Sequence, residues 1–398
     1  MRRTILLSGL MALIAACAPA ANEAETSSHA AQDDPLRITP LTSALLDPTA
    51  PVTRIAFGSC NQQWADQSIF GTIAGVEPDL FLFIGDNMYA DNYVQDIYAD
   101  LTLPNGGVLS SYKVDRARQA GPKYIAKAYR ELAASEPFAR LRKEVPLIAI
   151  WDDHDYGLND AGAAMPFKAA AQELFLKAYD IPQEDPRWSR EGIYGSYMLG
   201  PQGRRLHIIL LDTRSFRSAL KSTDEPMAEG KERYVPDPDP AKTMLGEAQW
   251  AWLEEELRKP ADLKVLVSSI QIVADGHGWE AWRTLPLERE RLFDLIEKTG
   301  AERVFAVTGD RHVGGLYREK AATPYPFYEL TSSSLNAPAR NNTAEAGPKR
   351  LGDIYNVENF GVIDIDWDAS AIALELRDKE GGVLLGQFVP FADLETDS

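Results

Sequence analysis

The chain has 398 residues, of which 45% are hydrophobic and 25% charged, a composition typical of a globular protein. Its 59 acidic residues outnumber its 41 basic residues and give a formal charge of −18, so the chain as a whole repels polyanions and nucleic-acid binding is not expected. The length is enough for one large α/β core or two smaller ones.

The N-terminus has the features of an export signal. Met1-Arg2-Arg3 is basic, and the apolar run that follows, up to Ala16, is too short to span a bilayer comfortably. The run ends in Leu13-Ile-Ala-Ala-Cys17, which resembles a bacterial lipobox with Cys17 as the acylated residue. Residues 1–17 are therefore predicted to be a lipoprotein-type signal peptide; an ordinary leader cleaved nearby, at about Ala20, is the alternative.

Residues 18–51 are rich in Ala, Thr, Ser, Pro and Asp without a period, which predicts a flexible tether. We expect an exported, monomeric protein that is attached to the membrane by a lipid on Cys17 and faces the periplasm or the cell surface. The route of export, Sec or Tat, stays open.

Apolar runs with Gly and Asp at their ends predict one folded domain over residues 52–392. Its first strands are expected at Thr53–Phe57, Leu80–Ile84, Leu147–Trp151, Leu206–Leu211, Leu263–Ser268 and Arg303–Thr308. Helices are expected at about 67–75, 122–134, 165–179, 246–259 and 287–299. Alternating segments at Tyr328–Thr331, Phe360–Trp367, Ala371–Leu376 and Val383–Val389 predict antiparallel strands. Strand–helix alternation followed by a β-rich end predicts an α/β domain with two sheets packed between helices, and residues 93–114 and 218–244 are expected to be long loops.

Five of the predicted strands end in a group that can bind a metal. These groups are Cys60, Asp86, Asp152, Asp212 and Asp310, with His154 and His312 beside two of them. A single Asp after a strand is more often a helix cap than a ligand. Five such ends in one chain favour a site at the carboxyl edge of the sheets, and so much charge at the end of buried strands needs a cation to balance it.

The ligand types indicate two kinds of metal. A thiolate from Cys60 and a phenolate from Tyr89 favour a Lewis-acidic transition ion such as iron(III). Carboxylates with the Asn159 carboxamide suit Ca²⁺ or another hard cation, and Asp86 is placed to bridge two ions. For Tyr89 alone, packing in the core is an equally good explanation.

Six motifs in one order resemble the alkaline phosphatase D (PhoD-like) family of metallophosphatases. They are Gly58-Ser-Cys60, Gly85-Asp86-Asn-Met-Tyr89, Trp151-Asp-Asp-His154, Asp212-Thr-Arg214, Ser268-Ser-Ile-Gln271 and Gly309-Asp-Arg-His312, and they span about residues 54–335. The resemblance implies a four-layer α/β/β/α sandwich, hydrolysis of phosphate esters by a metal-activated water, and a site holding Fe³⁺ and Ca²⁺.

The resemblance also implies roles for single residues. The expected iron ligands are Cys60, Asp86 and Tyr89, and the expected calcium ligands are Asp86, Asp152, Asn159 and Asp310. Arg214, together with Arg217, is expected to contact phosphate. His154 is expected to donate a proton to the leaving group or to steady the phosphate, and His312 to bind metal or support a ligand. Asp153 and Asp155 are expected to be outer-sphere or capping groups. The chain departs from the family pattern at Asp155, where Glu is expected, and its tether is too short for the extra β domain of many members.

Several functions stay open at this point. Within hydrolysis, phosphomonoesters, phosphodiesters and phospholipase D-like cleavage of phospholipids are alternatives that the long loops decide. A non-catalytic surface lipoprotein that binds metal is a further alternative. A serine hydrolase is disfavoured because no Gly-x-Ser-x-Gly occurs. The segment Gly276-His-Gly278-Trp-Glu-Ala281 is a poor dinucleotide fingerprint because of its bulky His277 and Trp279.

Overall fold

The structure, a computed structural model, describes residues 34–91, 121–339, 345 and 347–396. The predicted signal peptide, the first part of the predicted tether and the predicted loop at 93–114 lie outside these residues. Within the described part of the chain, no helix combines the length and the apolar character that crossing a membrane requires.

Two sheets form the centre of the molecule. The first has six strands in the order β13-β12-β11-β1-β2-β3, and the second has seven in the order β10-β8-β9-β7-β6-β5-β4. The strands of the first sheet are β1 Arg54–Gly58, β2 Leu80–Ile84, β3 Leu147–Ile150, β11 Asn359–Asp366, β12 Ala371–Asp378 and β13 Val383–Pro390. Those of the second are β4 Gly195–Leu199, β5 Leu206–Leu210, β6 Leu263–Ser268, β7 Val304–Thr308, β8 Gly314–Glu319, β9 Phe327–Ser332 and β10 Arg350–Tyr355.

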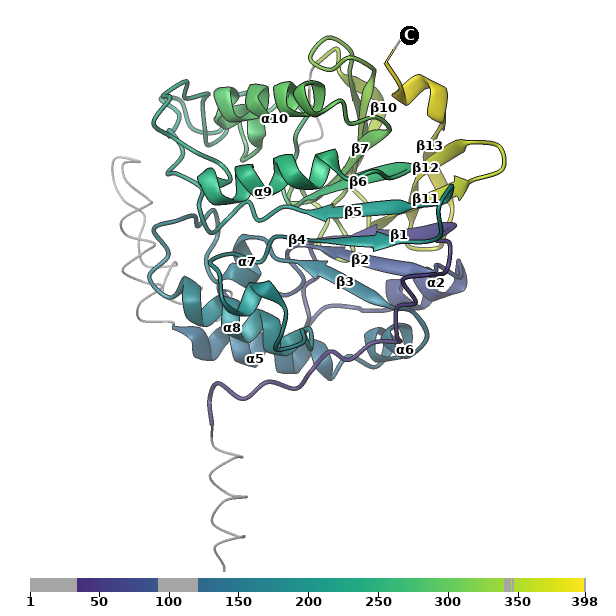
Figure 1. The fold of residues 1–398 in the computed structure, drawn as a ribbon. Coiled ribbons are helices and arrows are strands. Elements are labelled where there is room, and N and C mark those ends of the chain that lie inside the picture. Colours follow the sequence, from purple (N-terminus) through teal and green to yellow (C-terminus); the bar gives the residue numbers. More distant parts are fainter. Residues whose placement is uncertain (1–33, 92–120, 340–344, 346, 397–398) are drawn as a thin grey trace, which may run out of the picture.

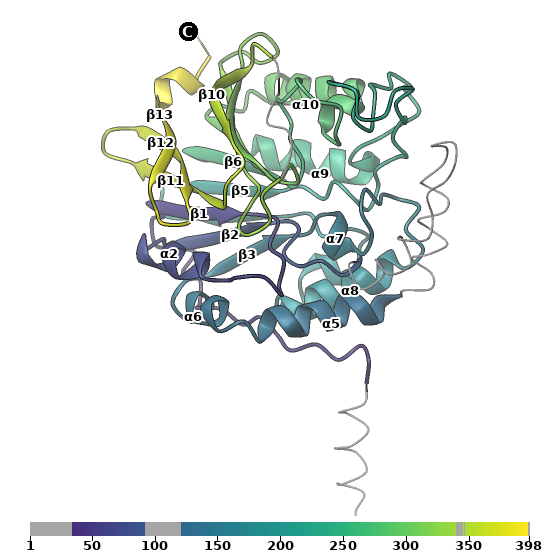
Figure 2. The same ribbon diagram turned by 180° about the vertical axis from the view of Figure 1, so that it is seen from behind.

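Helices cover the outer face of each sheet, as Figures 1 and 2 show. The helices on the side of the first sheet are α2 Ile69–Gly75, α5 Pro122–Ala133, α6 Glu136–Glu144 and α8 Lys168–Ala178. Those on the side of the second are α9 Gly246–Arg258 and α10 Pro286–Thr299. The result is helix, sheet, sheet, helix, which confirms the expected four-layer sandwich.

Aromatic packing joins the first sheet to its helices. Phe70 of α2 and Phe138 of α6 have ring centroids 4.7 Å apart, and both rings also contact Phe83 of β2, at 6.1 and 5.6 Å. All three side chains are fully buried. Offset and edge-to-face ring pairs of this kind add stabilisation to that of apolar burial, so this layer is rigid behind the strand ends.

The parallel strands bring their carboxyl ends together. β1, β2 and β3 are parallel in one sheet, and β5, β6 and β7 in the other. Contacts then cross between the sheets at that edge: the Ser269 hydroxyl, after β6, donates to Asp152, after β3, at 2.6 Å. Residues that follow strands of both sheets therefore share one site.

Three elements were not expected from the sequence: α6, β4 and β10. β4 and β10 are edge strands whose residues are mostly half-exposed or exposed, so they lack the continuous apolar run that marks a buried strand. A one-turn helix, α7 (Asp153–Tyr156), also follows β3 directly.

The prediction of a flexible tether is wrong for its second half, residues 34–51. Residues 34–51 lie along the domain: the Leu41 N–H donates to the Ala178 carbonyl at 2.6 Å, and the Ala44 N–H to the Arg142 carbonyl at 2.7 Å. Ala178 ends α8 and Arg142 lies in the last turn of α6, so the segment supplies donors to carbonyls that a helix leaves unpaired at its C-terminus. Composition cannot reveal such pairing, because it uses backbone atoms.

Candidate metal centre

The backbone takes a left-handed turn at four of the predicted site residues. Cys60, Asp86, Asp310 and His312 have φ values of 57°, 49°, 70° and 58°. Side chains other than glycine rarely adopt this conformation, and it costs energy that the surrounding structure must offset. The turns follow strands of both sheets, and their side chains contribute to two neighbouring groups of possible metal ligands.

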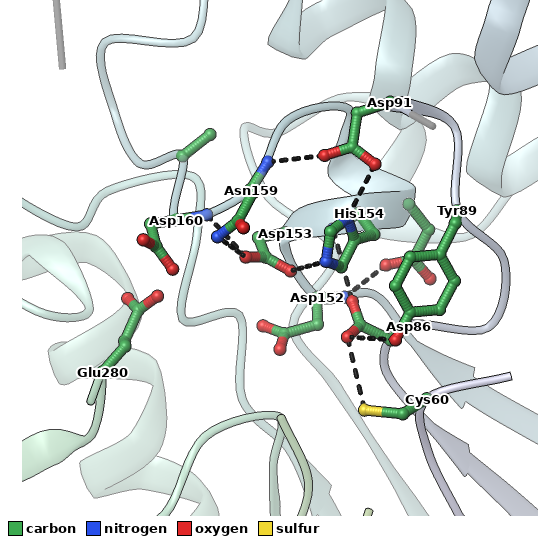
Figure 3. A network of polar contacts seen from close by, with 12 residues as sticks. Cys60, Asp86, Tyr89, Asp91, Asp152, Asp153, His154, Asn159, Asp160 and Glu280 are labelled. Carbon is green, nitrogen blue, oxygen red and sulfur yellow. Dashed lines mark hydrogen bonds and ion pairs between the residues drawn. The ribbon is translucent and has the colours of Figure 1, made fainter. Parts of the chain in front are cut away.

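A thiol, a phenol, a carboxylate and an imidazole meet in one corner of this site. The Cys60 Sγ lies 3.4 Å from Oδ2 of Asp86, and the Tyr89 hydroxyl lies 3.4 Å from the same oxygen. His312 Nε2 is 3.3 Å from the Tyr89 hydroxyl. Ligand atoms of Cys60, Asp86 and His312 all lie within 4.8 Å of one another, which is the spacing of ligands around one ion. Figure 3 shows Cys60, Asp86 and Tyr89 directed at each other.

The protonation of this corner reflects its burial. Burial raises the pKa of the Cys60 thiol to about 12 and lowers the pKa of His312 to about 4. His312 is therefore a neutral imidazole at physiological pH, and its Nδ1 pairs with the Ala337 carbonyl. This leaves Nε2 facing the corner with a lone pair, the form in which histidine binds metals.

Three carboxylates from Asp152, Asp153 and Asp310 meet beside this corner, also within 4.8 Å. Oδ1 of Asp152 accepts hydrogen bonds from Arg214 Nε and the Ser269 hydroxyl, both at 2.6 Å, whereas its Oδ2 is buried without a partner. Asp153 is alike: Oδ2 accepts the Asp160 N–H at 2.5 Å, and the buried Oδ1 has no hydrogen-bond partner. A buried carboxylate oxygen without a donor is costly, and a bound cation removes that cost. The residues therefore fit metal ions.

The ligand groups share members. Asp86 belongs to the corner with Cys60 and also to a group with Asp153 and His154. Asp153 belongs to three of the four groups found among the described residues, the last of them with Asp160 and Glu280. Asp153 was expected to be an outer or capping group, and its central place is a difference from that expectation.

His154 is held by the carboxylate of Asp91, which was not predicted from the sequence. Its Nδ1 lies 2.7 Å from Oδ1 of Asp91, and its Nε2 lies 3.9 Å from the unpaired Oδ1 of Asp153 (Figure 3). Burial alone would lower the pKa of His154, but the carboxylates of Asp91, Asp153 and Asp86 outweigh it and raise this pKa well above its usual value. The carboxylate of Asp91 thus favours the protonated imidazole and fixes its Nδ1, while Nε2 is directed towards Asp153.

The remaining predicted residues take defined places. The Asn159 amide donates to Oδ2 of Asp153 at 3.2 Å, and its backbone N–H donates to Asp91 at 3.0 Å. Asp155 accepts the Asp152 N–H at 2.5 Å in a capping box, the capping role expected of it. Asp212 belongs to none of the metal-ligand groups found among the described residues, because its oxygens accept from Trp151, Ile193 and Ser215.

Arg214 and Arg217 are fully buried behind the carboxylates. Glu280 joins them: its Oε2 lies 2.8 Å from Arg214 Nη1 and its Oε1 2.8 Å from Arg217 Nε. Neither Asp91 nor Glu280 had a signal in the sequence, since Asp91 lies in a turn after the Tyr89 motif and Glu280 lies in a loop. The tertiary fold alone brings these two residues to the site.

Known phosphatases are similar to this chain over most of its length. A profile of the PhoD-like phosphatase family matches residues 55–375. Alkaline phosphatase D of Bacillus subtilis (strain 168) is 25% identical over 310 residues, which are 72% of this chain and 49% of that protein. The chain thus spans about half the length of this curated relative.

Solved structures share the fold at low identity. A structure of PhoD has a TM-score of 0.60 at 18% identity and covers 90% of this chain and 73% of its own. GAP50, the anchor in the inner membrane complex of Plasmodium, has a TM-score of 0.51 at 14% identity over 87% and 97%. Since the family profile matches most of the chain, the protein belongs to the PhoD-like phosphatase family.

Proposed function

We propose that this protein hydrolyses phosphate esters with a metal-activated water. One observation carries the proposal: Asp152 and Asp153, which share a ligand group with Asp310, each have a buried carboxylate oxygen without a hydrogen-bond partner. Family membership and the similarity to alkaline phosphatase D support the same reaction class.

The proposed metals are Fe³⁺ and Ca²⁺. The thiol and phenol of Cys60 and Tyr89, with Asp86 and His312, are the donor set for the iron. The oxygens of Asp152, Asn159 and Asp310, with Asp86 shared, are the donor set for the calcium, and Asp153 joins them by its position. When bound, such ions hold phosphoryl oxygens and lower the pKa of a coordinated water.

His154 is the proposed proton donor. Its Nδ1–H is held by Asp91 at 2.7 Å, so the ring is oriented with Nε2 towards Asp153 and the site. The raised pKa keeps Nε2 protonated, and a proton can pass from Nε2 to the ester oxygen as the bond to phosphorus breaks. The carboxylate of Asp91 both orients the imidazole ring and stabilises its positive charge. Both effects favour proton transfer to the leaving group.

Arg214 has a positioning role in this proposal. Its side chain is fully buried, and its Nε and Nη1 point at Asp152 and Glu280 rather than at solvent. The guanidinium thereby fixes one oxygen of Asp152 and leaves the other for a metal. This role replaces the direct phosphate contact expected from the resemblance.

A phosphatase assay with metal analysis tests the proposal. We expect hydrolysis of aryl phosphates that chelation abolishes and added Ca²⁺ restores. Asp152→Ala is expected to lose both activity and bound metal, and full retention of both would sink the metal-centre assignment. Complete absence of activity with both metals bound would instead favour a non-catalytic metal-binding lipoprotein.

The class of ester is a finer question within the same proposal. Monoesters, diesters and phospholipase D-like substrates differ in the second group on phosphorus, which the loops around the site must admit. Parallel kinetics with a monoester and a diester of the same phenol decide between them, since the leaving group is constant.

We also propose that a lipid on Cys17 anchors the protein to the membrane after export. The motif Leu13-Ile-Ala-Ala-Cys17 supports this. Mass spectrometry of the N-terminal peptide from membrane fractions tests it, and an unacylated Cys17 would refute it.

A further inference from the structure

A tryptophan with two arginines lies beside the metal centre and has no part in the reaction described above. The guanidinium carbon of Arg233 is 5.1 Å from the ring centroid of Trp279, and that of Arg311 is 5.7 Å from it. Both distances are within the range of a cation–π contact, so the two cations share one aromatic ring. Trp279 itself is half-buried.

Each of the three residues is tied to the metal centre. Arg311 stands between Asp310 and His312 in the sequence, and Trp279 directly precedes Glu280. Arg233 Nη1 lies 2.7 Å from Oδ2 of Asp160, one of the carboxylates grouped with Asp153 and Glu280. In Figure 3, Asp160 and Glu280 face each other on the side of the site away from Cys60. The arginine–tryptophan group therefore adjoins that side.

Both arginines retain hydrogen-bonding capacity. The Arg233 side chain is 40% exposed, and of its guanidinium nitrogens only Nη1 has a hydrogen-bond acceptor among the described residues, on Asp160. The Arg311 side chain is 11% exposed, and its buried Nε has no acceptor among the residues that the structure describes. Its nearest carboxylate, on Glu345, is 3.9 Å away, too far for a hydrogen bond.

The charge of Asp160 raises the pKa of Arg233 and partly neutralises this guanidinium, whereas Arg311 has its carboxylate, Glu345, only at 3.9 Å. Burial and then the charges of Arg311 and Arg283 lower the pKa of the nearby His277 well below its usual value. An incompletely neutralised arginine pair beside a phosphate-ester site attracts a second anion, and guanidinium groups match carboxylate and phosphate oxygens in geometry.

The geometry points to a subsite in which Arg233, Trp279 and Arg311 bind a second anionic group, carried on the alcohol part of the ester. The inference rests on the proposed phosphoesterase function and adds the substrate class: esters with a carboxylate or a second phosphate next to the scissile one.

Two aryl phosphates that differ by one charge test the subsite. We expect the protein to prefer 4-carboxyphenyl phosphate over phenyl phosphate, and Arg233→Gln to lower the ratio of their kcat/KM values about tenfold, the effect of losing one charge-assisted hydrogen bond. Arg311→Gln should lower the ratio in the same direction, and Arg233→Lys, which keeps the charge, should lower it less. The substituent effect on intrinsic reactivity cancels, because the same two esters are compared across variants.

Arg140→Gln is the matched control, since Arg140 lies on α6 with a 68% exposed side chain and, among the residues that the structure describes, forms an ion pair only with Glu136 on the same helix. It removes the same charge far from the site and should leave the ratio unchanged. A ratio that is equal in the wild type and Arg233→Gln, or that Arg140→Gln lowers as much, would overturn the subsite.

A binding measurement separates this inference from the proposed function. Phenylphosphonate and 4-carboxyphenylphosphonate resist hydrolysis, and calorimetric titration of the metal-loaded protein gives their affinities. If none of the esters is hydrolysed but Arg233→Gln selectively weakens the carboxylated phosphonate, the phosphoesterase proposal fails and the subsite stands. If hydrolysis occurs and both phosphonates bind all variants with an unchanged affinity ratio, the subsite is refuted alone.

Discussion

Replacing Asp91 with asparagine is the sharpest test of the role given to His154. The Asp91 side chain is 6% exposed, and its Oδ1 lies 2.7 Å from His154 Nδ1. Asparagine preserves the shape and an acceptor for the Asn159 N–H, but it removes the charge that holds the imidazolium. A hydrogen bond between charged groups contributes about 1.5–3 kcal/mol, which corresponds to about 10- to 150-fold in rate if the bond acts fully in the transition state.

The assay compares two kinds of ester. An alkyl phosphate needs a proton on its leaving oxygen, whereas 4-nitrophenolate leaves without one. We expect Asp91→Asn to lower kcat for the alkyl phosphate about 10- to 100-fold and for 4-nitrophenyl phosphate much less. Since Asp91 helps to raise the pKa of His154, its loss lowers that pKa, and the alkaline limb of the kcat profile for the alkyl ester should move to lower pH.

Asp79→Asn serves as the control, because Asp79 also accepts backbone N–H groups, from Thr53 and Arg54, but precedes β2 at the far edge of the sheet. It should leave both esters unaffected. If Asp91→Asn changes kcat for both esters equally, or leaves the alkaline limb in place, His154 is not the proton donor and the orienting role of Asp91 is wrong.

Four further outcomes are expected. Asp153→Asn should lower the metal content by at least one ion per chain and the activity more than about 100-fold, because Asp153 joins three ligand groups; unchanged metal content would return it to the outer sphere. Cys60→Ser should lower the content of transition metal in elemental analysis while calcium stays bound, and loss of calcium alone would contradict the two donor sets. Leu41→Ala should destabilise the protein by about 2 kcal/mol in urea unfolding, since Leu41 is buried; a loss near zero would mean that residues 34–51 do not hold to the domain. The chelated protein should have a lower Tm at pH 8.5 than at pH 6. Burial raises the pKa of Asp152 to about 7, so the stability present when this carboxyl is protonated is lost as the pH rises through 7. The metal-loaded protein should show little of this dependence.

The chemistry of single strand ends could be predicted because it is local. A buried strand such as β2 or β7 is a continuous apolar run, and the polar residue that stops it, Asp86 or Asp310, is visible beside it. Strand–helix alternation with a β-rich end predicted two sheets packed between helices, and the family resemblance implied the four-layer order. Edge strands such as β4 carry no such run, and they were missed for that reason.

Partners could not be predicted where the chain returns from a distance. Asp91 and His154 are 63 residues apart, and Glu280 reaches Arg214 across 66 residues. Asp153 was misjudged for a different reason. It is the first residue of the one-turn helix α7, which was not predicted, and this helix places it among the ligand groups. Asp212 was a candidate ligand in the sequence, but its carboxylate oxygens accept hydrogen bonds from Trp151, Ile193 and Ser215 instead.

The sequence by itself determined the fold class and the identity of the groups at the strand ends, including Cys60, Asp86, Asp152, Asp310 and His312, because strand formation and strand termination depend on neighbouring residues. Tertiary structure alone decided which carboxylate oxygens have no hydrogen-bond donor and which arginines form ion pairs with carboxylates. It also decided which guanidinium groups lie beside Trp279. Those outcomes depend on distances between atoms far apart in the chain, and burial makes each unmatched charge costly enough to define where ions and substrate bind.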